Sequence, residues 1–147
     1  MSSIEHLEKY VGTHFTENPS AFGRWLNPVV VEVTQDKITV EFTVRENMTN
    51  AAGMLHGGII AGIADEMMGM HAMLGIHEGF FVSVSLQVNY LYGAKQGEVL
   101  RVESCLLRRG KTIAHVECLI KNADGIVVAK ATSSLARTNM SVQKIII

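Results

Sequence analysis

Apolar residues between Gly57 and Gly75 recur at helical spacing and predict one long helix. Successive members of one stripe are three or four positions apart, as on a helix face that packs on a core: Ile59, Ile63, Met67, Met70 and Leu74. The adjacent face carries Asp65, and its neighbours at helical spacing are Gly58, Ala61, Gly62, Met68, Gly69 and Ala72. Most of these neighbours are glycine or alanine, so the face is smooth and admits a ligand, a second subunit or a closely crossing helix. In the last case Asp65 is only a surface or capping acid.

Alternating apolar and polar positions predict strands in most of the remaining chain. Residues 29–44 alternate on both sides of a turn at Gln35–Lys37, and four further runs follow the long helix, at 80–91, 99–108, 112–121 and 126–137. Asp124-Gly125 is a hairpin signal, because glycine readily adopts positive φ. Four successive strands predict an antiparallel meander with the long helix covering one face, an α+β fold. A short amphipathic helix is expected over residues 4–15.

Size and composition fit a single domain over residues 1–147, with a lead-in at 1–20 and a tail at 139–147. Apolar residues make up 48% of the chain, which argues against disorder, and a net charge of −1 without a basic block argues against nucleic acid. The apolar stretch 55–76 contains ionisable side chains that each cost roughly 2.5 kcal/mol or more in a bilayer, so a buried helix is expected rather than a membrane span. The first residues show no secretion signal, and we expect a cytoplasmic protein.

The histidines and cysteines predict no metal site. The six histidines show no paired ligand spacing. Cys105 and Cys118 fall in expected strands without a CxxC motif and are interpreted as reduced, buried thiols. The terminal residues Ile145–Ile147 are expected either to pack against a second subunit or to be poorly ordered.

The start of the long helix is the candidate for chemistry. Asn50, His56, Gly57 and Gly58 lie at its opening, and Asp65 follows about two and a half turns later. Two glycines leave backbone N–H groups unpaired at the positive end of the helix dipole, which suits a carbonyl oxygen that gains negative charge. A nearby acid could activate water or attack directly. The segment therefore predicts an acyl-transfer site.

Each candidate residue also has a purely structural interpretation. His56 could only cap the helix, Asn50 could only shape its loop, and Ser83 could only belong to one face of a strand. Glu66 lies about 100° around the helix from Asp65 and is expected to be a solvated or interface acid. Met68, on the smooth face, is a candidate wall of a substrate pocket.

The ordered motifs resemble those of the hotdog fold, in which a curved antiparallel sheet wraps a long central helix. More narrowly, they resemble the phenylacetate-pathway (PaaI-type) branch of hotdog acyl-CoA thioesterases. The resemblance covers about residues 25 to 138 and rests on the following set: Asn50-x-x-Gly53-x-x-His56-Gly57-Gly58, Asp65, the strand from Val82 to Leu91, Gly97-Glu98-Val99-Leu100, Arg109-Gly110-Lys111 and Asp124-Gly125.

This resemblance implies a role for each matched residue. Gly57 would donate its N–H to the thioester oxygen with Asn50 beside it, and Asp65 would act across a dimer interface as general base or nucleophile. Ser83 would help to hold the water, and His56 would shape the pocket near the carbonyl. The residues expected to bind substrate are Gly58, Met68, Arg109, Gly110 and Lys111. The last three would meet the phosphates of coenzyme A, or form only a solvated hairpin tip.

The implied activity is hydrolysis of an acyl- or aryl-acyl-CoA to a free acid and coenzyme A, with coenzyme A entering only as part of the substrate. The implied assembly is a homo-oligomer, at least a dimer and expected to be a dimer of dimers. A non-catalytic acyl-CoA-binding or sensing protein is the alternative. Hydratase chemistry is disfavoured, because similar hydratases place the acid before the histidine and here His56 comes first.

Overall fold

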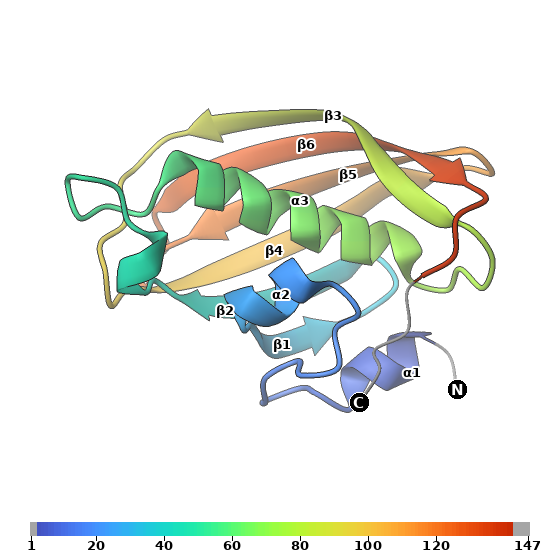
Figure 1. Ribbon diagram of the computed structural model, residues 1–147, viewed down its shortest axis with the longest axis horizontal. Coiled ribbons are helices and arrows are strands. Elements are labelled where there is room, and N and C mark those ends of the chain that lie inside the picture. The colour runs from blue at the N-terminus through green and yellow to red at the C-terminus, as the bar shows by residue number, and fades with distance from the viewer. Residues whose placement is uncertain (1–2, 143–147) are drawn as a thin grey trace.

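The computed structural model describes residues 3–142, which form one long helix, a six-stranded sheet and several short helical segments (Figure 1). The helical elements are α1 (Ser3–Glu8), α2 (Ala21–Leu26), the 3-10 turn η1 (Glu46–Met48) and α3 (Gly57–Met73). The strands are β1 (Val29–Val33), β2 (Lys37–Thr43), β3 (Phe80–Tyr90), β4 (Val99–Arg109), β5 (Ile113–Lys121) and β6 (Val127–Thr138). The predicted α+β hotdog architecture is confirmed.

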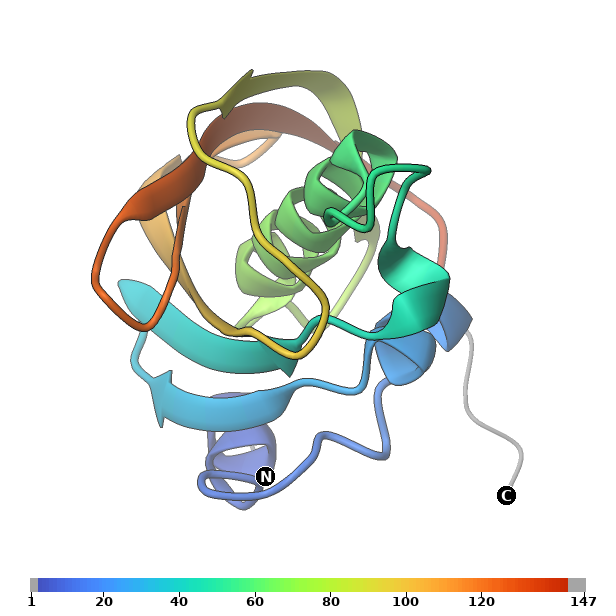
Figure 2. The same ribbon diagram turned by 90° about the vertical axis from the view of Figure 1, so that its left-hand side faces the viewer.

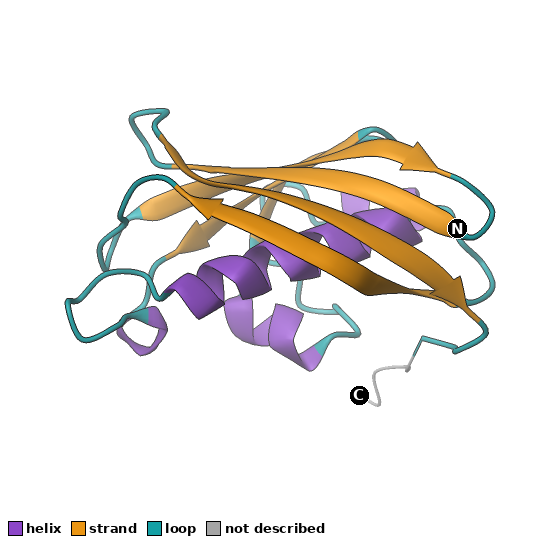
Figure 3. Cartoon of the chain, turned by 90° about the horizontal axis from the view of Figure 1, so that it is seen from above, coloured by secondary structure: helices purple, strands orange, loops and turns teal. Residues whose placement is uncertain are grey.

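The sheet curves around α3, which lies along its concave side (Figures 2 and 3). The strand order is β1-β2-β4-β5-β6-β3, and each neighbouring pair is antiparallel. The predicted four-strand meander is therefore wrong at its first member, because β3 pairs with β6 and ends the sheet. The free edge of β4 is taken by β2 instead. The loop after β3 returns past the start of α3, where the N–H of Leu55 donates to the carbonyl of Ala94 (2.7 Å).

The buried face of α3 packs on the sheet and is rotated slightly from the predicted stripe. Ile59 and Met70 of that stripe are partly exposed, whereas Ala64 and Met68 face the core. His71 turns inward as well, because both of its ring nitrogens find partners there. The full set of buried α3 residues is Ile60, Ile63, Ala64, Met67, Met68, His71 and Ala72. The smooth face is thus smaller than predicted and lacks Met68 and Ala72.

The amino-terminal segment differs from the expected helix over residues 4–15. α1 ends at Glu8, and Gly12 adopts a positive φ of 85° while its N–H donates to the carbonyl of Val30 (2.8 Å). The chain therefore turns at Gly12 and runs beside β1. The short helix α2 follows; Ser20 caps its start by accepting from the N–H of Gly23. Six residues are too few to show a helical period, so hydrophobic spacing did not reveal α2.

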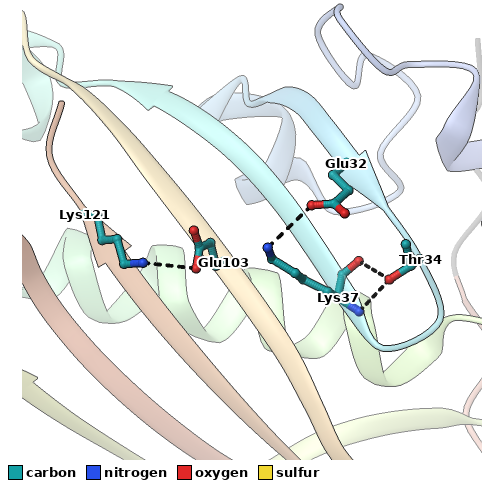
Figure 4. Close-up of polar contacts among 5 residues, drawn as sticks. All are labelled: Glu32, Thr34, Lys37, Glu103 and Lys121. Carbon is teal, nitrogen blue, oxygen red and sulfur yellow. Dashed lines mark hydrogen bonds and ion pairs between the residues drawn. The ribbon is translucent and has the colours of Figure 1, made fainter. Parts of the chain in front are cut away.

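The predicted turn between β1 and β2 is confirmed, and polar side chains hold it (Figure 4). The hydroxyl of Thr34 donates to the carbonyl of Lys37 (3.0 Å) and accepts from its N–H (2.9 Å). The ammonium of Lys37 pairs with Glu32 at 3.5 Å. Elsewhere in the sheet, Lys121 of β5 pairs with Glu103 of β4 at 3.4 Å.

Residues 3–142 contain no helix that is both long enough and apolar enough to cross a bilayer. Cys118 is buried, Cys105 is half-buried, and both are free thiols. Burial raises the pKa of the Cys118 thiol to about 12. The expectation for Ile145–Ile147 lies outside the described residues.

Candidate active site

The start of α3 leaves one backbone donor open. His56 is the N-cap, and its Nδ1 accepts from the N–H of Gly58 (2.9 Å) while its carbonyl accepts from Ile59 and Ile60. The N–H of Gly57 has no acceptor among residues 3–142. His56 therefore does cap the helix, as the structural interpretation expected, and the same cap singles out Gly57 as the free donor at the positive end of the dipole.

Asn50 organises the loop before α3. Its side-chain oxygen accepts from the N–H groups of Ala52 (2.9 Å) and Met54 (3.2 Å), and Gly53 completes the turn with a φ of 74°. With the oxygen engaged by the backbone, the amide nitrogen is the end of the side chain that remains to donate to a ligand.

Asp65 and Ser83 meet between α3 and β3. The Ser83 hydroxyl donates to Oδ1 of Asp65 at 2.6 Å. Asp65 is half-buried and Ser83 is exposed, so the pair is open to solvent on one side. The remaining carboxylate oxygen can accept a proton or attack an electrophile.

A second contact between α3 and β3 involves Tyr90, which sequence analysis did not single out. Its hydroxyl donates to the carbonyl of Gly57 (3.0 Å), and its ring lies beside Gly57, 3.4 Å from where a Cβ atom on that residue would sit. Gly57 is thus held to the last residue of β3, and Asp65 to a residue near its start. No local motif marks Tyr90, because only the pairing of β3 with the helix gives it this role.

A cleft of about 700 Å³ opens beside Asp65 and Ser83. Its floor is the outward face of α3, at Asp65, Glu66, Gly69, Met70 and Met73. Most of its walls are apolar and include Phe15, Phe80, Phe81 and Leu135. A mainly apolar cleft with a few convergent polar groups is the usual form of a small-molecule site.

Glu66 also borders the cleft, and it is half-buried and hydrogen-bonded within the chain rather than solvated. Oε2 accepts from the hydroxyl of Ser20 (3.0 Å), and Oε1 accepts from the amide of Asn18 (3.3 Å). Burial raises the pKa of Glu66, and the two hydrogen bonds oppose that shift. The sequence marks Ser20 only as a favoured helix-capping residue and gives no signal of its contact with Glu66.

The predicted substrate-binding residues lie in several places. Gly58 is at the helix start, and its N–H is occupied by His56. Met68 is fully buried in the core, while Met70 and Met73 reach the cleft instead. Met68 could therefore line a substrate pocket only if the core opened around it.

The turn Arg109-Gly110-Lys111 lies at the opposite end of α3 from Gly57. The Arg109 guanidinium donates to the carbonyls of Ala72 and Leu74 and so caps the carboxyl end of the helix. Burial, and then the neighbouring Arg137, lower the pKa of Arg109. Gly110 closes the turn by donating to the carbonyl of Ile113 (2.8 Å). Lys111 and Arg137 line a second, smaller hollow.

Among residues 3–142, no three His, Cys, Asp or Glu side chains are grouped so as to hold a metal ion. The chemistry that the described residues can supply is an oriented N–H donor, a carboxylate with a hydroxyl partner, and an apolar cleft. Together with the hotdog fold, these groups suit a thioester hydrolase. The chain belongs to the thioesterase superfamily, whose sequence profile matches residues 52–129.

Known relatives agree with this assignment. Human acyl-coenzyme A thioesterase 13 is 32% identical over 102 residues, which are 69% of this chain and 73% of that protein. A protein of Caenorhabditis elegans is 34% identical over 107 residues, 72% of this chain, and the match spans 63% of its length.

Solved structures show the same fold. Mouse thioesterase superfamily member 2 superposes with a TM-score of 0.76 at 28% identity and covers 92% of this chain and 98% of its own. The smu.793 protein of Streptococcus mutans, bound to acetyl CoA, superposes with a TM-score of 0.72 at 26% identity. The match covers 77% of this chain and 90% of that one. PaaI of Escherichia coli shares the fold, with a TM-score of 0.76 at 18% identity, and the match covers 84% of this chain and 88% of PaaI.

Proposed function

We propose that this protein is an acyl-CoA thioesterase whose active site is completed by a second copy of the chain. One subunit supplies the N–H of Gly57 as oxyanion donor, and the other supplies Asp65. The acetyl CoA bound to the S. mutans structure and the name of the human relative support coenzyme A thioesters as substrates.

The observation that carries the proposal is the separation of donor and acid along α3. Asp65 follows Gly57 by eight positions along α3, a rise of about 12 Å at 1.5 Å per residue. A general base must be within about 3 Å of the proton it takes, or act through one water. Donor and acid of the same chain therefore cannot both reach one thioester carbonyl.

The hydrogen bonds to β3 support a specific solution. Ser83 binds Asp65 and Tyr90 binds Gly57. In the ladder with β6 these two residues pair with Leu135 and Ala129, and Gln87, paired with Thr132, lies midway between them. If two β3 edges pair antiparallel about a two-fold axis at Gln87, Ser83 lies opposite Tyr90 of the partner subunit. Asp65 then comes level with Gly57 of the partner subunit.

The exposed edge strand supports this pairing. β3 ends the sheet, and it is followed by further exposed apolar residues. Val84 is 66% exposed and Tyr90 is 56% exposed. A long apolar edge strand is a template for pairing with another chain. We propose a symmetric dimer as the minimal active unit and a dimer of dimers as the full assembly, in the cytoplasm.

In this mechanism the thioester carbonyl accepts from the N–H of Gly57, with the amide of Asn50 and the imidazole of His56 beside it. Asp65, held by Ser83, either takes a proton from an attacking water or attacks the carbonyl carbon itself. The tetrahedral oxyanion is stabilised by the N–H donor. If water attacks, collapse breaks the carbon–sulfur bond and releases the acid, while the proton held by Asp65 passes to the sulfur of coenzyme A. If Asp65 attacks, collapse releases coenzyme A and leaves a mixed anhydride on Asp65, which water then hydrolyses to the acid. Lys111 and Arg137 are proposed to meet the phosphates of coenzyme A.

The test is thiol release from acetyl-, decanoyl- and phenylacetyl-CoA by wild type and Asp65→Asn. The matched control is Glu41→Gln, on the opposite part of the sheet in an ion pair with Arg101. We expect kcat to fall about 100-fold or more in Asp65→Asn, the usual loss when a general base is removed, and to stay unchanged in the control. Near wild-type turnover by Asp65→Asn contradicts the mechanism. Binding of all three thioesters without hydrolysis would favour an acyl-CoA-sensing protein.

A further inference from the structure

Glu66 ties a distant part of the chain to the helix that carries Asp65. Its carboxylate accepts from Asn18 and from Ser20, which are 48 and 46 positions away in the sequence. It is half-buried, so little water competes for these hydrogen bonds. Hydrogen bonds to a charged group are among the stronger side-chain contacts in proteins.

The segment that Glu66 binds is itself internally braced. Asn18 accepts from the N–H of Ser20 (2.9 Å), and its carbonyl accepts from the guanidinium of Arg24 (2.6 Å). Ser20 accepts from the N–H of Gly23 (3.1 Å) and so caps α2. Gly23 leaves room for all of this, because a side chain there would lie 2.3 Å from Glu66 and 2.1 Å from Asn18. The segment 18–24 therefore meets α3 as one unit.

The same segment is a wall of the cleft. Asn18, Pro19 and Ser20 line it opposite the β3 residues Phe80 to Ser83, and α3 forms the floor between them. In Figure 1, α3 lies between β3 on one side and α2 on the other. The distance between the two walls thus depends on the contact between Glu66 and residues 18–20.

We propose that Glu66 is a positioning residue that sets acyl specificity, by fixing residues 18–20 as the cleft wall facing β3. The inference rests on the proposed thioesterase function. The substrates it concerns carry apolar acyl groups long enough to extend past Asp65 into the cleft. An acetyl thioester carries only a methyl group beyond the reacting carbonyl carbon, and this group is too short to reach the wall.

The experiment measures kcat and KM for decanoyl-CoA and acetyl-CoA in four variants. Glu66→Ala removes the acceptor, Glu66→Gln keeps one acceptor oxygen, and Gly23→Ala forces Asn18 and the Glu66 carboxylate apart while leaving both side chains in place. Glu41→Ala is the control. We expect KM for decanoyl-CoA to rise about 10-fold in Glu66→Ala and Gly23→Ala, with kcat within about twofold of wild type. The reason is that each variant loses a hydrogen bond to a charged group, and that bond only positions a wall of the binding cleft. Glu66→Gln should fall between, and acetyl-CoA kinetics should not change.

A loss of kcat on both substrates in Glu66→Gln would overturn the proposal, because Glu66 would then act on the reacting atoms. Unchanged KM for decanoyl-CoA in both Glu66→Ala and Gly23→Ala would also overturn it. A second measurement, equilibrium binding of decanoate to each variant, does not depend on turnover. If the thioesterase mechanism fails but decanoate still binds more weakly to both variants than to wild type, the wall is supported and only the reaction is wrong.

Discussion

Three ionisable side chains of α3 illustrate how position decides their chemistry. Asp65 faces Ser83 in an open cleft, Glu66 is half-buried against Asn18 and Ser20, and His71 is fully buried. Nε2 of His71 must donate to the carbonyl of Gln35 (3.0 Å), since a carbonyl only accepts, and Nδ1 therefore accepts from the hydroxyl of Ser104 (2.9 Å). Burial, and not this network, favours the neutral imidazole, because both hydrogen bonds act to raise the pKa of His71.

The buried imidazole predicts a loss of stability in acid. Burial lowers the pKa of His71, with Arg109 as a lesser cause of the same sign and nearby Asp36 opposing it. A group with a lowered folded-state pKa contributes its full stability above its unfolded value of about 6.5 and loses it as the pH falls through the folded value. We expect the free energy of unfolding, measured by urea titration, to decline between about pH 7 and pH 5 more steeply in wild type than in His71→Gln. Parallel pH profiles for the two proteins would contradict this.

Glu66 has the opposite sign. Its raised folded-state pKa means that the associated stability is fully present below the unfolded value and is lost as the pH rises through the folded value. The contribution of either group to the pH dependence of stability is therefore isolated by comparing wild type with a variant at that position alone.

At the scale of elements, the two ends of α3 are held by different means. His56 caps the start, and the Arg109 guanidinium caps the end by donating to Ala72 and Leu74. A cation at a helix carboxyl end also interacts favourably with the dipole. The neighbouring Lys111 is exposed and has no such contact among the described residues.

This difference predicts separate effects for two neighbouring cations. Arg109→Gln should lower the free energy of unfolding by about 1–2 kcal/mol, because helix carbonyls lose a charged donor. Lys111→Gln should leave the unfolding midpoint unchanged and raise KM for acyl-CoA. Chemical denaturation and steady-state kinetics of both variants check this. The result that rules out the assignment is a stable Arg109→Gln with a large rise in KM.

At the scale of the whole molecule, the open edge of β3 predicts where two copies meet. Paired residues of antiparallel strands have Cα atoms about 4.5–5.5 Å apart, which suits a disulfide. Gln87→Cys should therefore form a covalent dimer on mild oxidation, seen by non-reducing electrophoresis, if the two-fold axis passes at this residue. Ser85→Cys is the matched control, since its two copies would be four ladder positions, or roughly 13 Å, apart.

A covalent dimer from Ser85→Cys but not from Gln87→Cys would shift the axis and separate Asp65 from Gly57 of the partner subunit. A monomer with full thioesterase activity in sedimentation would contradict the shared site altogether.

The sequence by itself determined the elements whose signals are local. The period of α3, the β1–β2 turn at Gln35–Lys37 and the Asp124-Gly125 hairpin follow from side-chain spacing and glycine geometry, and the structure confirms all three. The residues at the helix start and Asp65 could also be named, because a glycine pair and a lone acid on a smooth face are visible without coordinates. The family resemblance added their roles, which remain predictions.

Tertiary structure alone decided what depends on long-range contact. The pairing of β3 with β6, the burial of Met68, the capping role of Arg109 and the contact of Glu66 with residues 18–20 join positions far apart in the chain. Spacing along a sequence describes only one element at a time, whereas these features follow from which edges and faces are already occupied when the elements pack. The cleft beside Asp65 exists for the same reason, since three separate segments must meet to form it.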